Sequence, residues 1–181
     1  MKIRLASDKL LTDSIVDGEG LRAVLWTQGC SHNCKGCHNP ETHSFEKGVL
    51  VDVEDIKFLI KELVLQDGIT LSGGDPFFQP EAIKEIAKFA KQQGLTVWAY
   101  TGFTFEELVK YEKTKDALKY IDVLVDGKFE IENRTLSLKF RGSTNQRIID
   151  VKRSLKDNTA HKIKKYDQKK PKKVPQTLYV W

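Results

Sequence analysis

All three cysteines of this 181-residue chain lie within eight consecutive positions, as Cys30, Cys34 and Cys37 in the pattern C-x3-C-x2-C. An odd number of cysteines so close together cannot form a disulfide framework. They directly follow residues 22–27, a run of apolar and β-branched side chains that predicts a strand. We therefore expect a loop at the end of a strand, in a reducing compartment, whose thiols serve another purpose.

Three kinds of site are compatible with such a triplet. A [4Fe–4S] cubane takes one protein ligand per iron, so three thiolates leave one iron open for a small molecule. A structural zinc ion needs four ligands, and His32 or His38 could supply the fourth. Buried thiols that only fill space are the third alternative. Polar and glycine neighbours argue against the third, and the sequence favours the cluster.

Beyond residue 21, strand patterns alternate with helical patterns. Strands are predicted at residues 22–27, 69–71, 96–100 and 121–125, and helices at residues 53–66, from near Pro80 to before Gly94, and from Thr104, which stands at capping-box spacing from Glu107. Such alternation is typical of βα units around a parallel sheet. Four readable units are too few for a closed barrel of eight, so we expect an α/β fold, a partial open (βα) barrel of about five to six parallel strands.

The positive charge of the chain is concentrated near its end. Residues 152–181 hold ten of the 30 Lys and Arg residues but only two of the 25 acidic ones. The sequence therefore predicts a folded domain over residues 1–151 and a basic C-terminal tail over residues 152–181, either a solvated segment or, over residues 152–173, an aid to docking on an acidic partner. The tail has only three aromatic residues, so no nucleic-acid partner is expected.

Neither a membrane span nor a signal peptide is predicted. No run of 18 apolar residues occurs, and the first residues lack the apolar stretch of a secretory signal. We therefore expect no membrane partner and a cytoplasmic location.

Two motifs resemble those of the radical S-adenosylmethionine (SAM) superfamily. They are the cysteine triplet and the loop S-G-G-D-P at residues 72–76, which is similar to the GGEP-type loop of that superfamily. The resemblance implies that Cys30, Cys34 and Cys37 ligate a [4Fe–4S] cluster whose open iron binds SAM. It also implies a SAM-binding surface, formed by Gly36, Cys37, His38, Ser72, Gly73, Gly74 and Asp75. Glycines allow such close backbone approach, and Asp75 could complement the amino group of SAM.

Further motifs narrow the resemblance to activases of glycyl radical enzymes. D-G-E-G at residues 17–20 and D-G-K-F at residues 126–129 are of this kind. Y-T-G-F at residues 100–103 and R-G-S-T-N-Q at residues 141–146 are most similar to the activating proteins of anaerobic ribonucleoside-triphosphate reductase. The resemblance implies a radical SAM oxidoreductase that forms a glycyl radical on the large subunit of that reductase, with a flavodoxin-like electron donor.

Asp126 and Lys128 match an Asp-x-Lys pair that, in a related activase, lies near SAM and the substrate peptide. A surface ion pair between the two is the alternative interpretation. His32 and His43 are interpreted as solvated loop residues, because hydrogen-atom abstraction by a carbon radical needs no general base. No catalytic side chain is therefore predicted.

Overall fold

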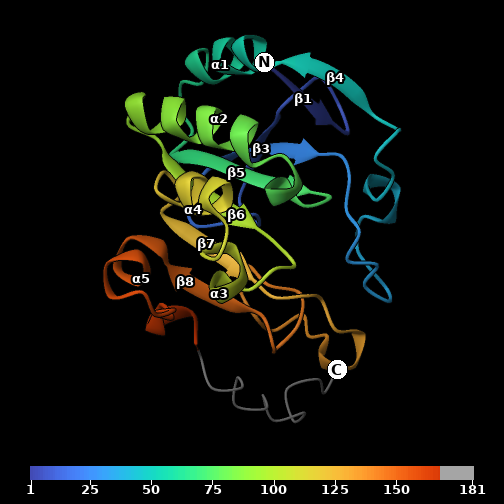
Figure 1. Cartoon of the computed structure of the whole chain (residues 1–181), viewed down its shortest axis with the longest axis vertical. Helices are drawn as coiled ribbons and strands as arrows, with labels where there is room; N and C mark the ends of the chain where they lie inside the picture. Colours follow the sequence, from blue (N-terminus) through green and yellow to red (C-terminus); the bar gives the residue numbers. More distant parts are fainter. Residues whose placement is uncertain (168–181) are drawn as a thin grey trace, which may run out of the picture.

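The computed structural model describes residues 1–167. In this part of the chain eight strands form one mixed sheet in the order β4-β1-β3-β5-β6-β7-β8, with β2 paired to β3 beside β1 (Figure 1). The strands are β1 (Lys2–Leu5), β2 (Leu11–Ser14), β3 (Arg22–Thr27), β4 (Val49–Asp52), β5 (Gly68–Gly73), β6 (Thr96–Tyr100), β7 (Val123–Asp126) and β8 (Arg147–Asp150).

The four predicted strands form the parallel centre of this sheet. β3, β5, β6 and β7 pair in parallel, with Leu25 opposite Leu71 and Ala99 opposite Leu124. Within the described residues four strands pair in parallel, fewer than the five or six expected, because β1 and β2 run antiparallel to β3, and β8 runs antiparallel to β7. Antiparallel edge strands need no crossover helix, so they leave no βα pattern in the sequence.

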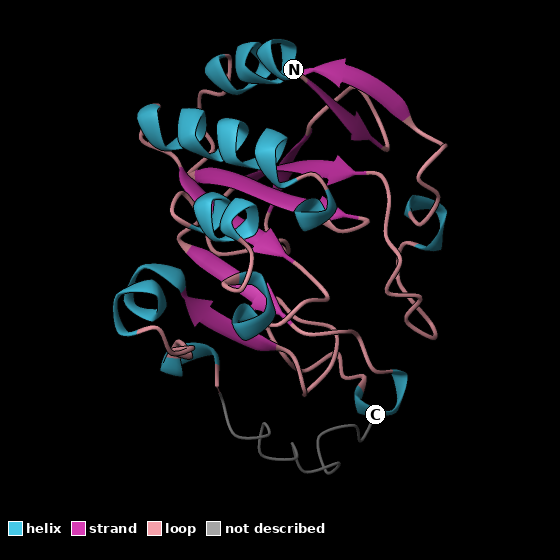
Figure 2. Cartoon of the chain, viewed as in Figure 1, coloured by secondary structure: helices cyan, strands magenta, loops and turns pink. Residues whose placement is uncertain are grey.

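Helices cover one face of the sheet (Figure 2). They are α1 (Val53–Lys61), α2 (Pro80–Gln92), α3 (Phe105–Leu108), α4 (Glu112–Leu118) and α5 (Val151–Asp157). In α2, the side chains of Ile83, Ile86, Ala87 and Ala90 repeat at helical spacing and are fully buried. They join the larger buried apolar cluster together with α1, α4 and alternate residues of the parallel strands.

The helix predicted for residues 53–66 ends five residues early. α1 stops at Lys61, and Val64 and Leu65, whose apolar character extended the prediction, are 87% and 76% exposed. The chain turns instead, because Asp67 donates its backbone N–H to the carbonyl of Leu21 and so aligns the start of β5 with β3. An apolar pattern alone cannot reveal this long-range constraint.

The opposite face carries a smaller cluster of aromatic side chains. Side chains alternate across a strand, so in β6 Val97 and Ala99 face the helices while Trp98 belongs to the second cluster. The Trp98 ring lies 5.3 Å from that of Phe140 and 5.8 Å from that of Tyr166. Beneath it, the fully buried Arg22 guanidinium lies 5.8 Å from the Trp98 ring, and burial lowers its pKa to about 10.

Residues 152–167 pack against the sheet. Val151 and Ser154 of α5 are fully buried, and Tyr166, which is 7% exposed, donates its hydroxyl to Glu19 over 2.6 Å. The expectation of a solvated segment therefore does not hold for Ser154 and Tyr166, although most other side chains of residues 152–167 are exposed. Residues 168–181 lie outside the described residues.

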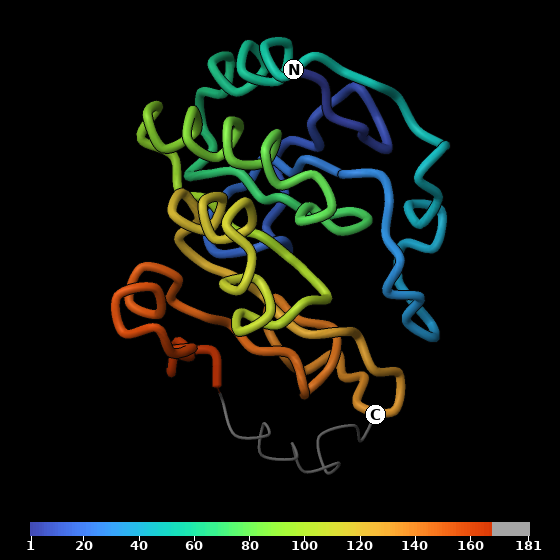
Figure 3. The backbone as a smooth tube through the Cα atoms, in the orientation of Figure 1, coloured from blue at the N-terminus to red at the C-terminus, as the bar shows by residue number. Residues whose placement is uncertain are grey.

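Two long loops extend from the carboxyl ends of the parallel strands, and in Figure 3 both lie on the same side of the molecule. Residues 28–48 follow β3 and residues 127–146 follow β7. They meet where the His38 and Phe129 rings lie 4.7 Å apart. Among residues 1–167, no helix combines the length and apolarity that crossing a bilayer requires.

Candidate metal and cofactor site

A cavity of about 130 Å³ opens between these loops and the strand ends. It brings together residues from both motifs that the sequence singles out. Those that line it are Cys30, Cys34, Cys37, His38, Ser72, Gly73 and Gly74. One part of the remaining wall comes from the end of β6, the loop after it and the loop between β7 and β8, with Tyr100, Thr101, Gly102, Gly127, Phe129 and Gln146. Another part comes from the cysteine loop, with His32, Asn39 and His43.

The three thiols are free and half-buried at this cavity. Burial raises the pKa of the Cys30 thiol to about 11 and also raises the pKa of Cys34. Asn39 donates its backbone N–H to Cys37 Sγ at 3.4 Å, while the backbone at His32 and at Phe129 partly offsets the rise in pKa at Cys30 and at Cys34. Such N–H donors stabilise cluster-bound thiolates and tune cluster potentials, so the chemistry of this donor set fits an iron–sulfur cluster.

The zinc alternative receives no support from the geometry. Within residues 1–167, no three His, Cys, Asp or Glu side chains are grouped so as to hold a single metal ion. One zinc ion would need its four ligands within about 2.3 Å of itself. In a cubane each thiolate binds a different iron, so the cysteines need not converge on one point.

Close packing is one reason why residue 74 is a glycine. A Cβ atom there would lie 2.5 Å from the carbonyl oxygen of Gly29 and 2.9 Å from that of Thr42. The absent side chain thus lets the β5 loop pack directly on the backbone that leads into Cys30. A larger residue would displace the cysteine loop, so a Gly74 substitution cannot test SAM binding separately from cluster binding.

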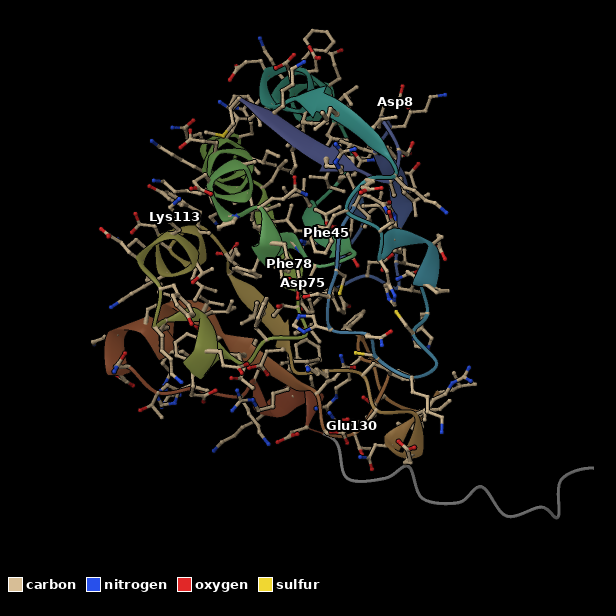
Figure 4. The ribbon with its side chains drawn as sticks, turned by 45° about the vertical axis from the view of Figure 1, so that its right-hand side comes forward. Asp8, Phe45, Asp75, Phe78, Lys113 and Glu130 are labelled. Atoms are coloured by element: carbon tan, nitrogen blue, oxygen red, sulfur yellow. The ribbon has the colours of Figure 1, made fainter. Side chains whose placement is uncertain are left out.

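Asp75 does not line the cavity, and Figure 4 shows it close to Phe78 in the middle of the molecule. Its side chain is 1% exposed. The Oδ2 atom accepts hydrogen bonds from His32 Nε2 at 2.7 Å, Thr101 Oγ1 at 2.8 Å and the Gly102 N–H at 2.9 Å, and Oδ1 accepts one from the Phe77 N–H. With these four donors, Asp75 ties the cysteine loop to the ends of β5 and β6 instead of facing the amino group of a ligand.

His32 is the part of this tie that belongs to the cysteine loop. Its side chain is 8% exposed, and its ring packs edge-on against that of Phe103 at 4.5 Å. The interpretation of His32 as a solvated residue is therefore wrong. Its burial depends on Asp75 and Phe103, which no local pattern around the cysteines contains.

Gly36, Asp126 and Lys128 do not line the cavity. Asp126 is fully buried and accepts hydrogen bonds from the Phe105 N–H at 2.7 Å and Arg147 Nε at 2.9 Å. Its ion-pair partner is thus Arg147 and not the exposed Lys128, so the alternative of an Asp126–Lys128 pair is wrong. Asp126 fixes the end of β7, beside which Gly127 forms part of the cavity wall.

The wall residues Tyr100, Thr101, Gly102, Phe129 and Gln146 were not assigned to the site from the sequence. Their motifs, Y-T-G-F and R-G-S-T-N-Q among them, stand out as a resemblance, but a motif does not show which of its side chains face a cavity. Gln146, for example, donates Nε2 to the carbonyl of Gly127 and accepts from the Gly142 N–H with Oε1. It thereby joins the two turns that close this side.

Comparison with known proteins agrees with a cluster at this site. The family model described as "4Fe-4S single cluster domain" matches residues 16–149, which include the three cysteines and the whole parallel centre of the sheet. The fold and site thus define a protein with a single-cluster iron–sulfur domain.

Curated relatives narrow the family. The anaerobic ribonucleoside-triphosphate reductase-activating protein of Haemophilus influenzae is 39% identical over 73% of this chain and 89% of its own length. The protein of the same name from enterobacteria phage T4 is 36% identical over 78% of this chain and 91% of its own length. This chain therefore belongs to the family of anaerobic ribonucleoside-triphosphate reductase-activating proteins. The crystal structure of QueE from Escherichia coli aligns with a TM-score of 0.48 and 16% identity over 57% of this chain and 54% of QueE, too low for the folds to be equated.

Proposed function

We propose that this protein is an activase that uses a [4Fe–4S] cluster and SAM to form a glycyl radical on the large subunit of an anaerobic ribonucleoside-triphosphate reductase. One observation carries the proposal. In a chain of this family, the three free thiols and the Ser72-Gly73-Gly74 backbone line the same cavity. The cluster and its open iron would thus stand directly beside the loop proposed to bind SAM.

The residues present fit both groups. Cys30, Cys34 and Cys37 would hold three irons, while the backbone of residues 37–38 and 72–74 would line SAM. When bound, the reduced cluster and SAM supply a 5′-deoxyadenosyl radical that can abstract a hydrogen atom from glycine. The organic chemistry belongs to the cofactors, and the protein positions and shields them.

The chain's own residues hold this site together from behind. Asp75 and His32 fix the cysteine loop against the ends of β5 and β6, and Asp126 with Arg147 fixes the end of β7. These contacts are buried on at least one side. A cavity framed in this way would keep its shape while the cofactors exchange, which suits an enzyme that must bind SAM repeatedly.

Four finer features belong to the same proposal. The curvature of the parallel centre would be that of a partial open barrel, and a flavodoxin-like protein would donate the electron. A cytoplasmic location would keep the three thiols reduced until the cluster is inserted. Lys128, which is exposed in the loop after β7, would face the substrate.

The test is anaerobic reconstitution with iron and sulfide, followed by incubation with SAM, a reductant and the reductase. We expect about four irons per chain and a glycyl radical EPR signal on the reductase. Cys34→Ala should lose most of the iron and all of the radical, whereas Ser31→Ala, an exposed position in the same loop, should lose neither. Stoichiometric zinc without iron uptake would overturn the proposal.

A further inference from the structure

A second and larger cavity, of about 630 Å³, adjoins the cysteine cavity. The two share His38 and Tyr100 as wall residues. The other walls come from residues 15–17, which follow β2, and from residues 134–142 of the loop before β8. Its volume lies within the range of about 300–1,000 Å³ usual for ligand sites. Apart from His38, none of these wall residues belongs to the cluster ligands or to the motifs proposed to bind SAM.

The rim of the larger cavity is apolar and exposed. Ile15, Val16 and Leu136 all line it and are 73%, 71% and 90% exposed. Single exposed apolar residues are ordinary, but several around one cavity mark an interaction site. Arg134 and Lys139 also lie on this wall and are exposed. The cavity thus offers apolar contacts next to positive charge.

Arg141 anchors the wall that residues 134–142 form. Its side chain lines the cavity and is only 6% exposed. Two of its nitrogens donate to the backbone carbonyls of Gln146 and Tyr166, at 3.0 and 2.6 Å. Its Nε–H, however, is buried and finds no acceptor within residues 1–167. Because this atom is inaccessible from the cavity, Arg141 holds the loop of residues 134–142 against Gln146 and Tyr166 instead of contacting a ligand.

Phe140 shows that the wall is held firmly. It adopts a positive φ of 58°, which is rare for a bulky residue. Its ring is fixed between those of Trp98 and Tyr166, at 5.3 and 5.5 Å. Such backbone persists only where surrounding contacts impose it, and it clusters at ligand-binding positions. The wall that presents Arg141 and Leu136 is therefore built on a fixed aromatic support.

We propose that this larger cavity receives the segment of the reductase that carries the target glycine, bound as an extended peptide. The inference rests on the proposed function and names the surface that recognises the substrate. Continuity through His38 and Tyr100 would lead the segment to the cysteine cavity. Apolar side chains of the segment contact Ile15, Val16 and Leu136, and neighbouring acidic groups face Arg134 and Lys139.

The experiment measures binding of the reductase large subunit to reconstituted protein. Leu136→Asp and Ile15→Asp place a carboxylate on the apolar rim, and Val64→Asp is the matched control, since Val64 is 87% exposed but does not line the cavity. Because all three side chains are exposed, we expect each variant to keep the iron content and unfolding midpoint of the wild type. The rim variants should weaken binding about tenfold or more, equivalent to about 1.4 kcal/mol, and slow glycyl radical formation to match. Rim variants that bind like Val64→Asp would overturn the assignment.

Overlapping synthetic peptides that tile the reductase identify the occupant. Those containing the target glycine should compete with the reductase for the wild type, and competition only by peptides from elsewhere would overturn the assignment. Failure of the proposed function is separate, because it would appear in the wild-type protein as an absence of SAM cleavage and of glycyl radical, whatever the binding data show.

Discussion

The two faces of the sheet differ in how completely they are filled. The helix-covered face is packed with fully buried side chains such as Val97, Ala99 and Ile86. On the other face, Trp98 supports an aromatic cluster and Tyr100 stands between two cavities. Alternate residues of β6 thus serve different purposes: one set contributes packing free energy and the other shapes a site. The comparison teaches that stability and function can be altered separately.

The largest expected effect is a loss of stability without a loss of iron, from a substitution on the helix-covered face. Ile86→Ala removes a fully buried side chain from α2 and should lower the free energy of unfolding by about 2–5 kcal/mol, because a cavity remains in the core. The iron content per folded chain should stay unchanged. Denaturant unfolding and iron analysis measure both, with Leu65→Ala, at a 76% exposed position, as the control. A parallel loss of iron from folded protein would contradict the separation.

Substitution of Asp75 tests how the packed core and the cysteine loop depend on each other. Asp75→Asn keeps the size of the side chain but replaces one acceptor oxygen by a donor, which would face the donors now served by the carboxylate. We expect a loss of about 1–3 kcal/mol in stability and faster removal of iron by a chelator, since the cysteine loop is no longer tied down. Asp8→Asn, at an exposed position, should behave as wild type. A rate of iron release equal to that of the wild type would show that Asp75 does not hold the cysteine loop in place.

Removal of the basic residues 168–181 tests whether the reductase docks on more than the face of the sheet that carries the two cavities. Truncation after Asp167 keeps Tyr166 in its buried place and should leave the unfolding midpoint and iron content unchanged. If the positive charge assists docking, glycyl radical formation should slow by up to about tenfold at low salt and less at high salt, because electrostatic steering is screened. Equal rates at low salt would exclude this role for residues 168–181.

The smallest effect concerns the ion pairs at the end of β7. Arg147 holds the pKa of the Glu106 carboxyl below its usual value and has its own pKa raised by Asp126 and Glu106. Since Glu106 is 53% exposed, Glu106→Gln should cost only about 0.2–1 kcal/mol at pH 7. A carboxyl group whose pKa is lowered by folding stabilises the fold at pH values above its ordinary pKa. This contribution is lost as the pH falls through the lowered pKa. Unfolding of both proteins should therefore converge in acid; a constant difference would argue against the pair.

Local patterns in the sequence predicted those features of the structure that depend on residues close together in the chain. β3 and β6 coincide with the predicted residues 22–27 and 96–100, and the capping box at Thr104 and Glu107 forms as expected. The cysteine triplet stands in a loop after β3. Each of these features is set by a run of side chains or by a spacing of a few residues, which is why composition and periodicity reveal them.

By itself, the sequence determined the parallel centre of the sheet and the place of the thiols within it. Only the tertiary structure decided that Asp75 binds His32, 43 positions away, and that Tyr166 is buried beside Glu19, 147 positions away. It also decided that Arg141 and Leu136 share a cavity wall with Tyr100. Contacts between such distant residues depend on how the loops fold back over the strand ends, and no local pattern of charge or apolar side chains encodes that path.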